Sequence, residues 1–243
     1  MDIQQRITDK EQISLYHADC MECFKSMPDN SVTLTLTDIP YAVLNDLKGT
    51  KRERYAGALR KHTKDEADEL NFDLNIFVDE ICRITSGSCY VFCSTEQVSE
   101  LRARFIHNGL STRLGIWEKT NPAPSNGEHL WLSGIETCVF ARKSKATFNE
   151  HCKNSVWRFP SGGSKDHPTQ KPLELFKYLT KVSSNKDDLV MDCCMGSGTA
   201  GVAAMELDRR FLGMETNKLW FDFAHNRICR SIEAHERKQE RFI

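Results

Sequence analysis

Residues 189–199 read LVMDCCMGSGT, an apolar run followed by a turn that carries two glycines. The pattern predicts a buried strand over Leu189–Asp192 and a helix over Ala200–Leu207. The glycines let the backbone approach a ligand closely, although a tight strand-to-helix turn can also require glycine for structural reasons alone. The segment therefore predicts an α/β unit whose loop is a candidate cofactor cradle.

The same alternation of apolar runs and helical patterns extends along the chain. Strands are predicted at Ile13–His17, Val32–Leu36, Cys89–Cys93, Thr112–Glu118, Ile135–Ala141, Leu189–Asp192 and Arg210–Glu215. Helices are predicted at Met21–Met27, Leu74–Ile84, Val98–His107, Pro172–Val182, Ala200–Leu207 and Lys218–Glu236. The polar, basic stretch from Arg142 to Asp166 is predicted to be irregular, with Trp157 and Phe159 isolated in it. This order is typical of a parallel sheet with crossover helices.

Composition limits the class of protein. A chain of 243 residues with 40% hydrophobic content can bury one sizeable core, so a single domain over residues 1–243 is expected. The formal net charge is -1, so contacts with a polyanion must come from local basic clusters. No apolar run approaches the roughly 20 residues that span a bilayer, and the amino terminus has no signal-peptide pattern, which favours a cytoplasmic protein.

The ten cysteines favour buried, reduced thiols, because several of them lie in predicted strands. Cys20 and Cys23 form a C-x-x-C pair, but no second pair follows at zinc-ligand spacing. We therefore expect no metal site.

Two further motifs accompany the glycine loop. The predicted strand Val32–Leu36 is followed by TDIPY at Thr37–Tyr41, and HPTQKP at His167–Pro172 precedes the helix that leads into the loop. The turn resembles the catalytic tetrapeptide of the amino methyltransferases. The loop resembles the Asp-Pro-Phe-x-Gly-Ser-Gly-Thr loop with which these enzymes hold S-adenosylmethionine, and HPTQKP resembles their H-P-T-x-K-P motif.

The order of the motifs, with the catalytic turn first and the cofactor loop last, resembles that of the permuted β group of DNA methyltransferases. The resemblance implies a circularly permuted, Rossmann-like α/β fold with a mostly parallel, seven-stranded sheet flanked by helices. The last predicted strand, Arg210–Glu215, has no successor, and the first, Ile13–His17, has no helix before it. A permutation joins these two ends and brings Asp19 to the cofactor pocket.

The resemblance implies S-adenosylmethionine as the cofactor, with Asp192 at its ammonium, Glu215 at its ribose and Asp19 at its adenine. The full set of expected cofactor-binding residues is Asp19, Cys20, Asp38, His167, Thr169, Lys171, Asp192, Cys193, Gly196, Ser197, Gly198, Thr199, Glu215 and Asn217. A dinucleotide fits less well, because the G-x-G-x-x-G spacing is only partly present and an acid beside a diphosphate would repel it.

The expected catalytic residues are Asp38, Ile39, Pro40 and Tyr41. Asp38 and the Ile39 carbonyl would accept the two hydrogens of a base amine, Pro40 would stiffen the turn, and Tyr41 would stack on a flipped base. The chain departs from the family in having Ile39 in place of proline, which adds a backbone N–H and some freedom, and Cys193-Cys194 in place of proline-phenylalanine. An isolated tetrapeptide of this kind is more often an ordinary turn with an Asp cap.

Basic residues cluster after this turn, in a loop at about 45–64, where phosphate contacts would position DNA. A short target-recognition insertion is expected at about 142–166, which implies a short or relaxed recognition sequence or a second subunit, as in a homodimer. The expected DNA-binding residues are Lys48, Lys51, Arg52, Arg54, Lys119, Asn121, Arg142, Lys143 and Arg158. A charge run is by itself more often a solvated face.

The sequence thus predicts a DNA adenine-N6 methyltransferase of a restriction-modification system or a phage, because the resemblance links an initial Asp to adenine enzymes more than to cytosine-N4 enzymes. A cytosine-N4 methyltransferase and a catalytically silent nucleic-acid-binding protein of the same fold are the alternatives.

Overall fold

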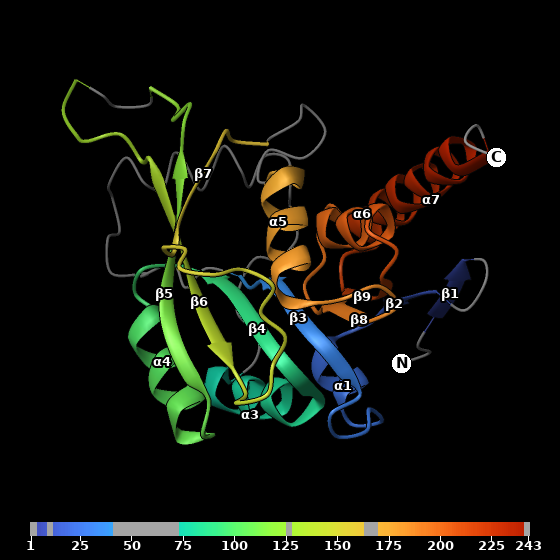
Figure 1. Ribbon diagram of the computed structural model, residues 1–243, viewed down its shortest axis with the longest axis horizontal. Helices are drawn as coiled ribbons and strands as arrows, with labels where there is room; N and C mark the ends of the chain where they lie inside the picture. Colours follow the sequence, from blue (N-terminus) through green and yellow to red (C-terminus); the bar gives the residue numbers. More distant parts are fainter. Residues whose placement is uncertain (1–3, 9–11, 41–72, 125–127, 163–169, 241–243) are drawn as a thin grey trace.

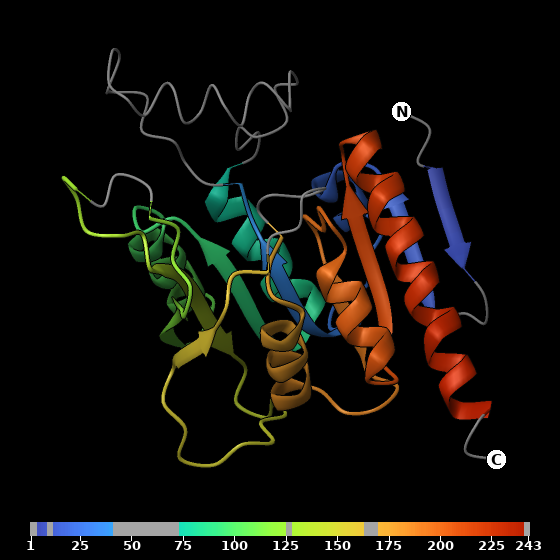
Figure 2. The ribbon, with the colours of Figure 1, turned by 90° about the horizontal axis from the view of Figure 1, so that it is seen from above.

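The computed structural model describes residues 4–8, 12–40, 73–124, 128–162 and 170–240, which form one sheet with helices on both faces (Figure 1, Figure 2). The strands are β1 Gln4–Thr8, β2 Ile13–His17, β3 Val32–Asp38, β4 Thr85–Cys93, β5 Ser111–Lys119, β6 Ile135–Arg142, β7 Val156–Phe159, β8 Leu189–Asp192 and β9 Arg210–Glu215. The helices are α1 Cys20–Phe24, α3 Leu74–Ile84, α4 Val98–His107, α5 Leu173–Ser183, α6 Thr199–Glu206 and α7 Lys218–Glu240.

The strand order in the sheet is β1-β2-β9-β8-β3-β4-β6-β5-β7. Five neighbouring strands, β2, β9, β8, β3 and β4, run parallel. Strand β6 runs antiparallel to β4, β5 to β6, and β1 to β2. The first parallel strand of the chain, β2, pairs with the last, β9, which is the adjacency that a circular permutation requires.

Each face of the sheet has its own apolar core. Helices α5, α6 and α7 cover one face, where Phe176 and Ile228 are buried, and α1, α3 and α4 cover the other (Figure 1). Helix α3 illustrates the helical periodicity of apolar residues, because its residues at positions 74, 77, 78 and 81 form one apolar stripe against the sheet. Asp73 begins this helix by accepting hydrogen bonds from the amides of Asn75 and Ile76.

All seven predicted strands are present, and the described residues contain two more, β1 and β7. The prediction that 142–166 is irregular throughout was wrong, because β7 pairs in parallel with β5 inside that stretch. Trp157 of β7 is only 8% exposed, and its ring covers Gly115 of β5, where a Cβ would collide with it. A strand of four residues is too short to show a period in the sequence, and the space above a glycine is a tertiary feature.

No helix in the described part of the chain combines the length and the apolar character needed to cross a membrane.

Candidate active site

Four acidic residues meet at one edge of the sheet. Asp38 ends β3, Asp192 ends β8, Glu215 ends β9, and Asp19 follows β2 as the cap of α1. These four strands are neighbours in the order β2-β9-β8-β3 and run parallel, so their carboxyl ends share an edge. The fold therefore brings together the acidic residues that the sequence motifs at the two ends of the chain single out.

The loop between β8 and α6 has a backbone shape that favours glycine. Gly196 and Gly198 have positive φ angles of 46° and 72°. A Cβ on Gly198 would also lie 3.0 Å from the Cβ of Ala224 in α7. The two glycines thus have a structural role of their own, which is compatible with ligand binding and does not depend on it.

Glu215 connects this loop to the end of β9. Its Oε2 accepts a hydrogen bond from the amide of Gly196 at 2.9 Å, and its Oε1 accepts one from the amide of Asn217 at 2.8 Å. Burial raises the pKa of the Glu215 carboxyl, while these amide donors oppose the rise. Each carboxylate oxygen has two acceptor positions, so Glu215 can shape the loop and still accept ligand hydroxyls.

Asp192 is a buried carboxyl, 3% exposed, whose Oδ1 accepts a hydrogen bond from the amide of Cys194 at 3.2 Å. Burial raises the pKa of Asp192 well above its usual range, and the neighbouring Cys193 and Asp38 raise it further. A positive ligand group would compensate the negative charge that burial makes costly. The site therefore fits the ammonium of an amino-acid ligand.

Two of the expected cofactor residues also cap helices. The Asp19 Oδ1 accepts a hydrogen bond from the amide of Met21 at 2.8 Å at the start of α1. The Asn217 Oδ1 accepts one from the amide of Leu219 at 2.9 Å at the start of α7. Helix capping fixes both side chains at the site edge, and their contact with a cofactor stays a prediction.

Arg227 of α7 is a site residue that the sequence motifs do not reveal. Its Nη1 donates hydrogen bonds to the Ser197 carbonyl and to the Thr199 hydroxyl, both at 2.9 Å. Burial lowers the pKa of this guanidinium. The only sequence signal is an arginine on the same helix stripe as the buried Ala224 and Ile228.

We expect Arg227→Met to destabilise the fold by about 1.5–3 kcal/mol, because the glycine loop loses charged hydrogen bonds from a partly buried donor. Denaturant unfolding measures the loss. The matched control is Arg230→Met, at an exposed position of the same helix, which should change the unfolding free energy by no more than about 0.5 kcal/mol. Equal effects of the two variants would contradict the role of Arg227.

The turn after β3 is anchored by a backbone hydrogen bond to β4 and by a side-chain hydrogen bond from the residue that precedes α4. The Ile39 amide donates to the carbonyl of Phe92 at 3.1 Å, and the Ile39 side chain is 1% exposed. The buried Gln97, another residue without a sequence signal, donates from Nε2 to the Pro40 carbonyl at 3.2 Å. The expectation that Ile39 adds freedom was therefore wrong, because its N–H extends the strand pairing and its side chain packs in the core.

Ile39→Pro should lower the free energy of unfolding by about 2–4 kcal/mol, because proline has no N–H for Phe92 and leaves part of a buried volume empty. The control is Ile39→Val, which keeps the amide and loses one methylene, at a cost of about 0.5–1.5 kcal/mol. Chemical denaturation of both variants tests the prediction, and a proline variant as stable as the valine variant would refute it.

Asp38 is part of a row of four alternating charges. Lys171 donates from Nζ to the Asp38 Oδ2, and the same Nζ lies 3.2 Å from the Glu136 Oε2. On the far side of Glu136, its Oε1 lies 2.9 Å from the Nζ of Lys119. Lys171 is thus placed between two carboxylates at the end of the turn, and Glu136 has no motif that marks it in the sequence.

Cys193 and Cys194, the second departure from the family pattern, lie beside Cys20 of α1. Hydrogen bonds from these two thiols lower the pKa of Cys20 to about 5. The Cys193 Sγ also lies within hydrogen-bond distance of the Thr37 Oγ1, at 3.4 Å. Thiol contacts thus join the start of the glycine loop to α1 and β3. Among the described residues, no group of three or more His, Cys, Asp or Glu side chains could hold a metal ion.

The expected DNA-binding residues divide between two edges of the sheet. Arg158 pairs with Glu118 at 2.9 Å, and Asn121 accepts a hydrogen bond from the Ser161 amide at 2.6 Å, near the carboxyl end of β5. Arg142 is the last residue of β6 and Lys143 follows it, at the opposite edge of the sheet, where the Lys143 Nζ donates to the Asn30 Oδ1 at 2.7 Å. These two are therefore not brought to the edge that carries Asp38.

Several expected site residues lie outside the described residues. They are Tyr41, Lys48, Lys51, Arg52, Arg54, His167 and Thr169.

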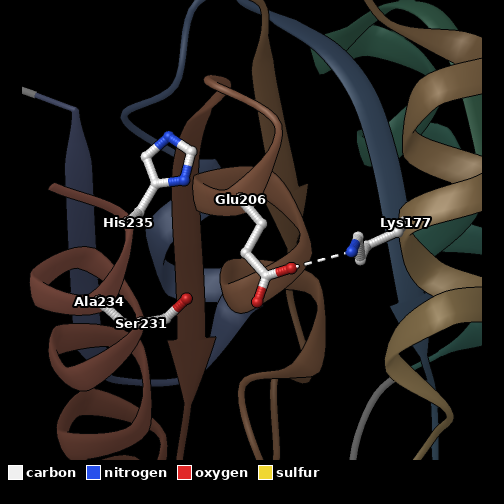
Figure 3. Close-up of a pocket in the computed structure, with 5 residues that line it drawn as sticks. All are labelled: Lys177, Glu206, Ser231, Ala234 and His235. Carbon is white, nitrogen blue, oxygen red and sulfur yellow. Dashed lines mark ion pairs between the residues drawn. The ribbon is translucent and has the colours of Figure 1, made fainter. Parts of the chain in front are cut away.

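A small surface pocket lies elsewhere, between α5, α6 and α7 (Figure 3). Figure 3 shows Lys177 and Glu206 paired across it, 2.9 Å apart, with His235 on the opposite side. None of the residues expected at the active site lines this pocket.

The fold is similar to that of solved DNA methyltransferases. In the solved structure of the M1.HpyAVI–SAM complex, a chain 27% identical in sequence superposes with a TM-score of 0.67, and the match covers 88% of this chain and 99% of that one. The type II methyltransferase M.HinfI of Haemophilus influenzae is 29% identical over an alignment of 250 positions, gaps included, and the match covers 88% of this chain and 68% of the relative. M2.MboI of Moraxella bovis is 26% identical over an alignment of 247 positions, gaps included, and the match covers 90% of this chain and 89% of the relative.

The family model N6_N4_Mtase, described as DNA methylase, matches residues 32–226. The match spans most of the chain and includes the turn at Asp38, the glycine loop and Glu215. The chain therefore belongs to the N6/N4 family of DNA methylases.

Proposed function

We propose that this DNA methyltransferase transfers a methyl group from S-adenosylmethionine to the N6 amine of adenine, in a base turned out of the duplex. One observation carries the proposal: Asp38 ends β3 at the same edge as Asp192 and Glu215, on neighbouring strands. This shared edge supports the proposal, because the candidate acceptor for the base amine lies on a strand next to those of the candidate cofactor-binding acids. The relatives named above are DNA methyltransferases, and one was solved with the same cofactor.

The residues present fit this cofactor. Asp192 would receive its ammonium, Glu215 its ribose hydroxyls and Asp19 its adenine, with the glycine loop beside it. When bound, S-adenosylmethionine supplies an electrophilic methyl group on a positively charged sulfur. The chain's part is to hold that methyl in line with the base nitrogen and to exclude water.

The base amine is a poor nucleophile because its lone pair is delocalised into the ring. Asp38 would accept one amine hydrogen and the Ile39 carbonyl the other, so the lone pair becomes localised on nitrogen. The Ile39 amide and Gln97 hold the turn that aims these acceptors. Tyr41 would stack on the extruded base.

DNA would lie along the same edge. The basic segment from Lys48 to Lys64 follows the catalytic turn in the sequence and would contact phosphates. The connection between β5 and β6 extends beyond the sheet in Figure 1 and carries Trp131, which is 100% exposed. An exposed indole at this position offers a face on which a base can stack.

The test is the transfer of a labelled methyl group from S-adenosylmethionine to unmethylated genomic DNA, followed by digestion to nucleosides and mass identification. N6-methyladenine is the expected product. N4-methylcytosine would overturn the adenine assignment, and cofactor binding without any transfer would favour a silent DNA-binding protein.

A further inference from the structure

The row of charges at the catalytic turn is built from four separate elements. Asp38 ends β3, Glu136 lies in β6, Lys119 ends β5, and Lys171 precedes α5. The side chains of Lys171 and Glu136 are 7% and 20% exposed, so solvent screens their interaction only weakly. Antiparallel pairing of β6 with both β4 and β5 is what places Glu136 at this edge.

The charge state of Lys171 depends on both of its carboxylate partners. Burial alone would lower the pKa of its ammonium, but the charges of Asp38 and Glu136 raise it above the usual value. Burial alone would raise the pKa of the Glu136 carboxyl, but the charges of Lys171 and Lys119 lower it below the usual value. Each interior member of the row is therefore kept ionised by a neighbour on either side.

Other titratable side chains of neighbouring strands also interact with this row. Among the described residues, Asp192 of β8, Cys93 of β4 and Cys138 of β6 interact electrostatically with Asp38. Burial raises the pKa of both thiols, which are therefore neutral near pH 7. The Phe92 ring lies 5.8 Å from the Lys171 Nζ and covers it with apolar surface. Glu136 is thus the second anion that Lys171 contacts directly.

We propose that Glu136 is a positioning residue for methyl transfer: it holds Lys171 in place beside Asp38, and Lys119 holds Glu136 in turn. This inference rests on the proposed function and assigns Glu136 and Lys119 a part in it. The hydrogen bond from the Lys171 Nζ to the Asp38 Oδ2 fixes the orientation of the Asp38 carboxylate. Lys171 interacts with both Asp38 and Glu136, so its positive charge neutralises Asp38 only in part. Asp38 therefore remains a good acceptor for the amine hydrogen.

The first test compares Glu136→Gln, Glu136→Asp and the control Glu206→Gln. Glu206 also forms an ion pair with a lysine, Lys177, at 2.9 Å, but this pair is more exposed and lies in the pocket of Figure 3. We expect Glu136→Gln to lower kcat about tenfold while the KM for S-adenosylmethionine changes less than about twofold. Glu136→Asp keeps the charge and should recover part of kcat, and Glu206→Gln should match the wild type.

The pH profile of kcat separates positioning from a general loss of stability. Glu136→Gln removes one of the two anions that raise the pKa of Lys171, so the alkaline limb should begin at lower pH than in the wild type. An unchanged kcat and alkaline limb in Glu136→Gln would overturn the inference. A Glu206→Gln variant with the same loss would also overturn it.

The effect of Glu136 on the charge state of Lys171 can also be measured without enzyme turnover. In protein labelled with 13C at lysine Cε, the Lys171 resonance is the one that disappears in Lys171→Met. At pH 10 it should remain at its charged position in the wild type and move toward the neutral position in Glu136→Gln, and equal positions would overturn the coupling. A wild type that transfers no methyl group would instead overturn the proposed function, while this titration still decides the link between Glu136 and Lys171.

Discussion

Asp38→Asn is expected to lower kcat by about 100-fold or more while the affinity for S-adenosylmethionine changes less than about threefold. Asparagine keeps the size of the side chain but loses the negative charge that attracts a base-amine hydrogen. The fold should persist, because Lys171 keeps its second carboxylate, Glu136, 3.2 Å away. Single-turnover methyl transfer to DNA measures the effect on chemistry, and calorimetry measures cofactor binding.

The control for this variant is Asp79→Asn. Asp79 also forms an ion pair, with Arg104, but it lies on the face of the sheet covered by α3 and α4. Removing the charge of Asp79 should leave methyl transfer near the wild-type rate. If Asp38→Asn kept more than about a fifth of the wild-type kcat, Asp38 would not be the amine acceptor.

Asp192→Asn is expected to weaken binding of S-adenosylhomocysteine, the product that keeps the ammonium, by about 100-fold at pH 7.5. The sign of its pH dependence follows from the buried site. Because burial raises the pKa of Asp192, a neutral carboxyl predominates below that pKa, and the ammonium has no ion-pair partner. Wild-type affinity should therefore rise as the pH is increased from the acid side toward 7.5, whereas the asparagine variant should show no such rise.

Titration calorimetry across this pH range tests both parts of the prediction. Asp188→Asn is the matched control, since Asp188 stands just before β8 at the opposite end of the strand and accepts a hydrogen bond from the Asn185 amide at 2.7 Å. It should keep the wild-type affinity and pH dependence. A wild-type affinity that is flat with pH would contradict the assignment of Asp192 to the ammonium.

The fold class could be predicted because its signal is local and repeated. Each buried strand is an apolar run, and each strand-to-helix unit ends in a recognisable turn, as at Leu189–Thr199. Strand β7 was not predicted, because the burial of its Trp157 depends on the space above Gly115 in another strand. The anchoring of the turn through Ile39 was not predicted for the same reason, since the carbonyl that accepts from its amide belongs to Phe92, which is distant in the sequence.

The grouping of the acids at the carboxyl ends of the parallel strands could be predicted from the sequence, because parallel pairing places those ends at one edge whatever the details of packing. The contacts that hold Asp38 and the site loops could not be predicted in this way, because they form only in the folded chain. Glu136, Arg227 and Gln97 are single polar residues within otherwise ordinary elements, and they acquire partners only when antiparallel strands and a terminal helix fold against the site. Their contacts are long-range hydrogen bonds and ion pairs, which depend on side-chain distance in space and leave no periodic pattern along the chain.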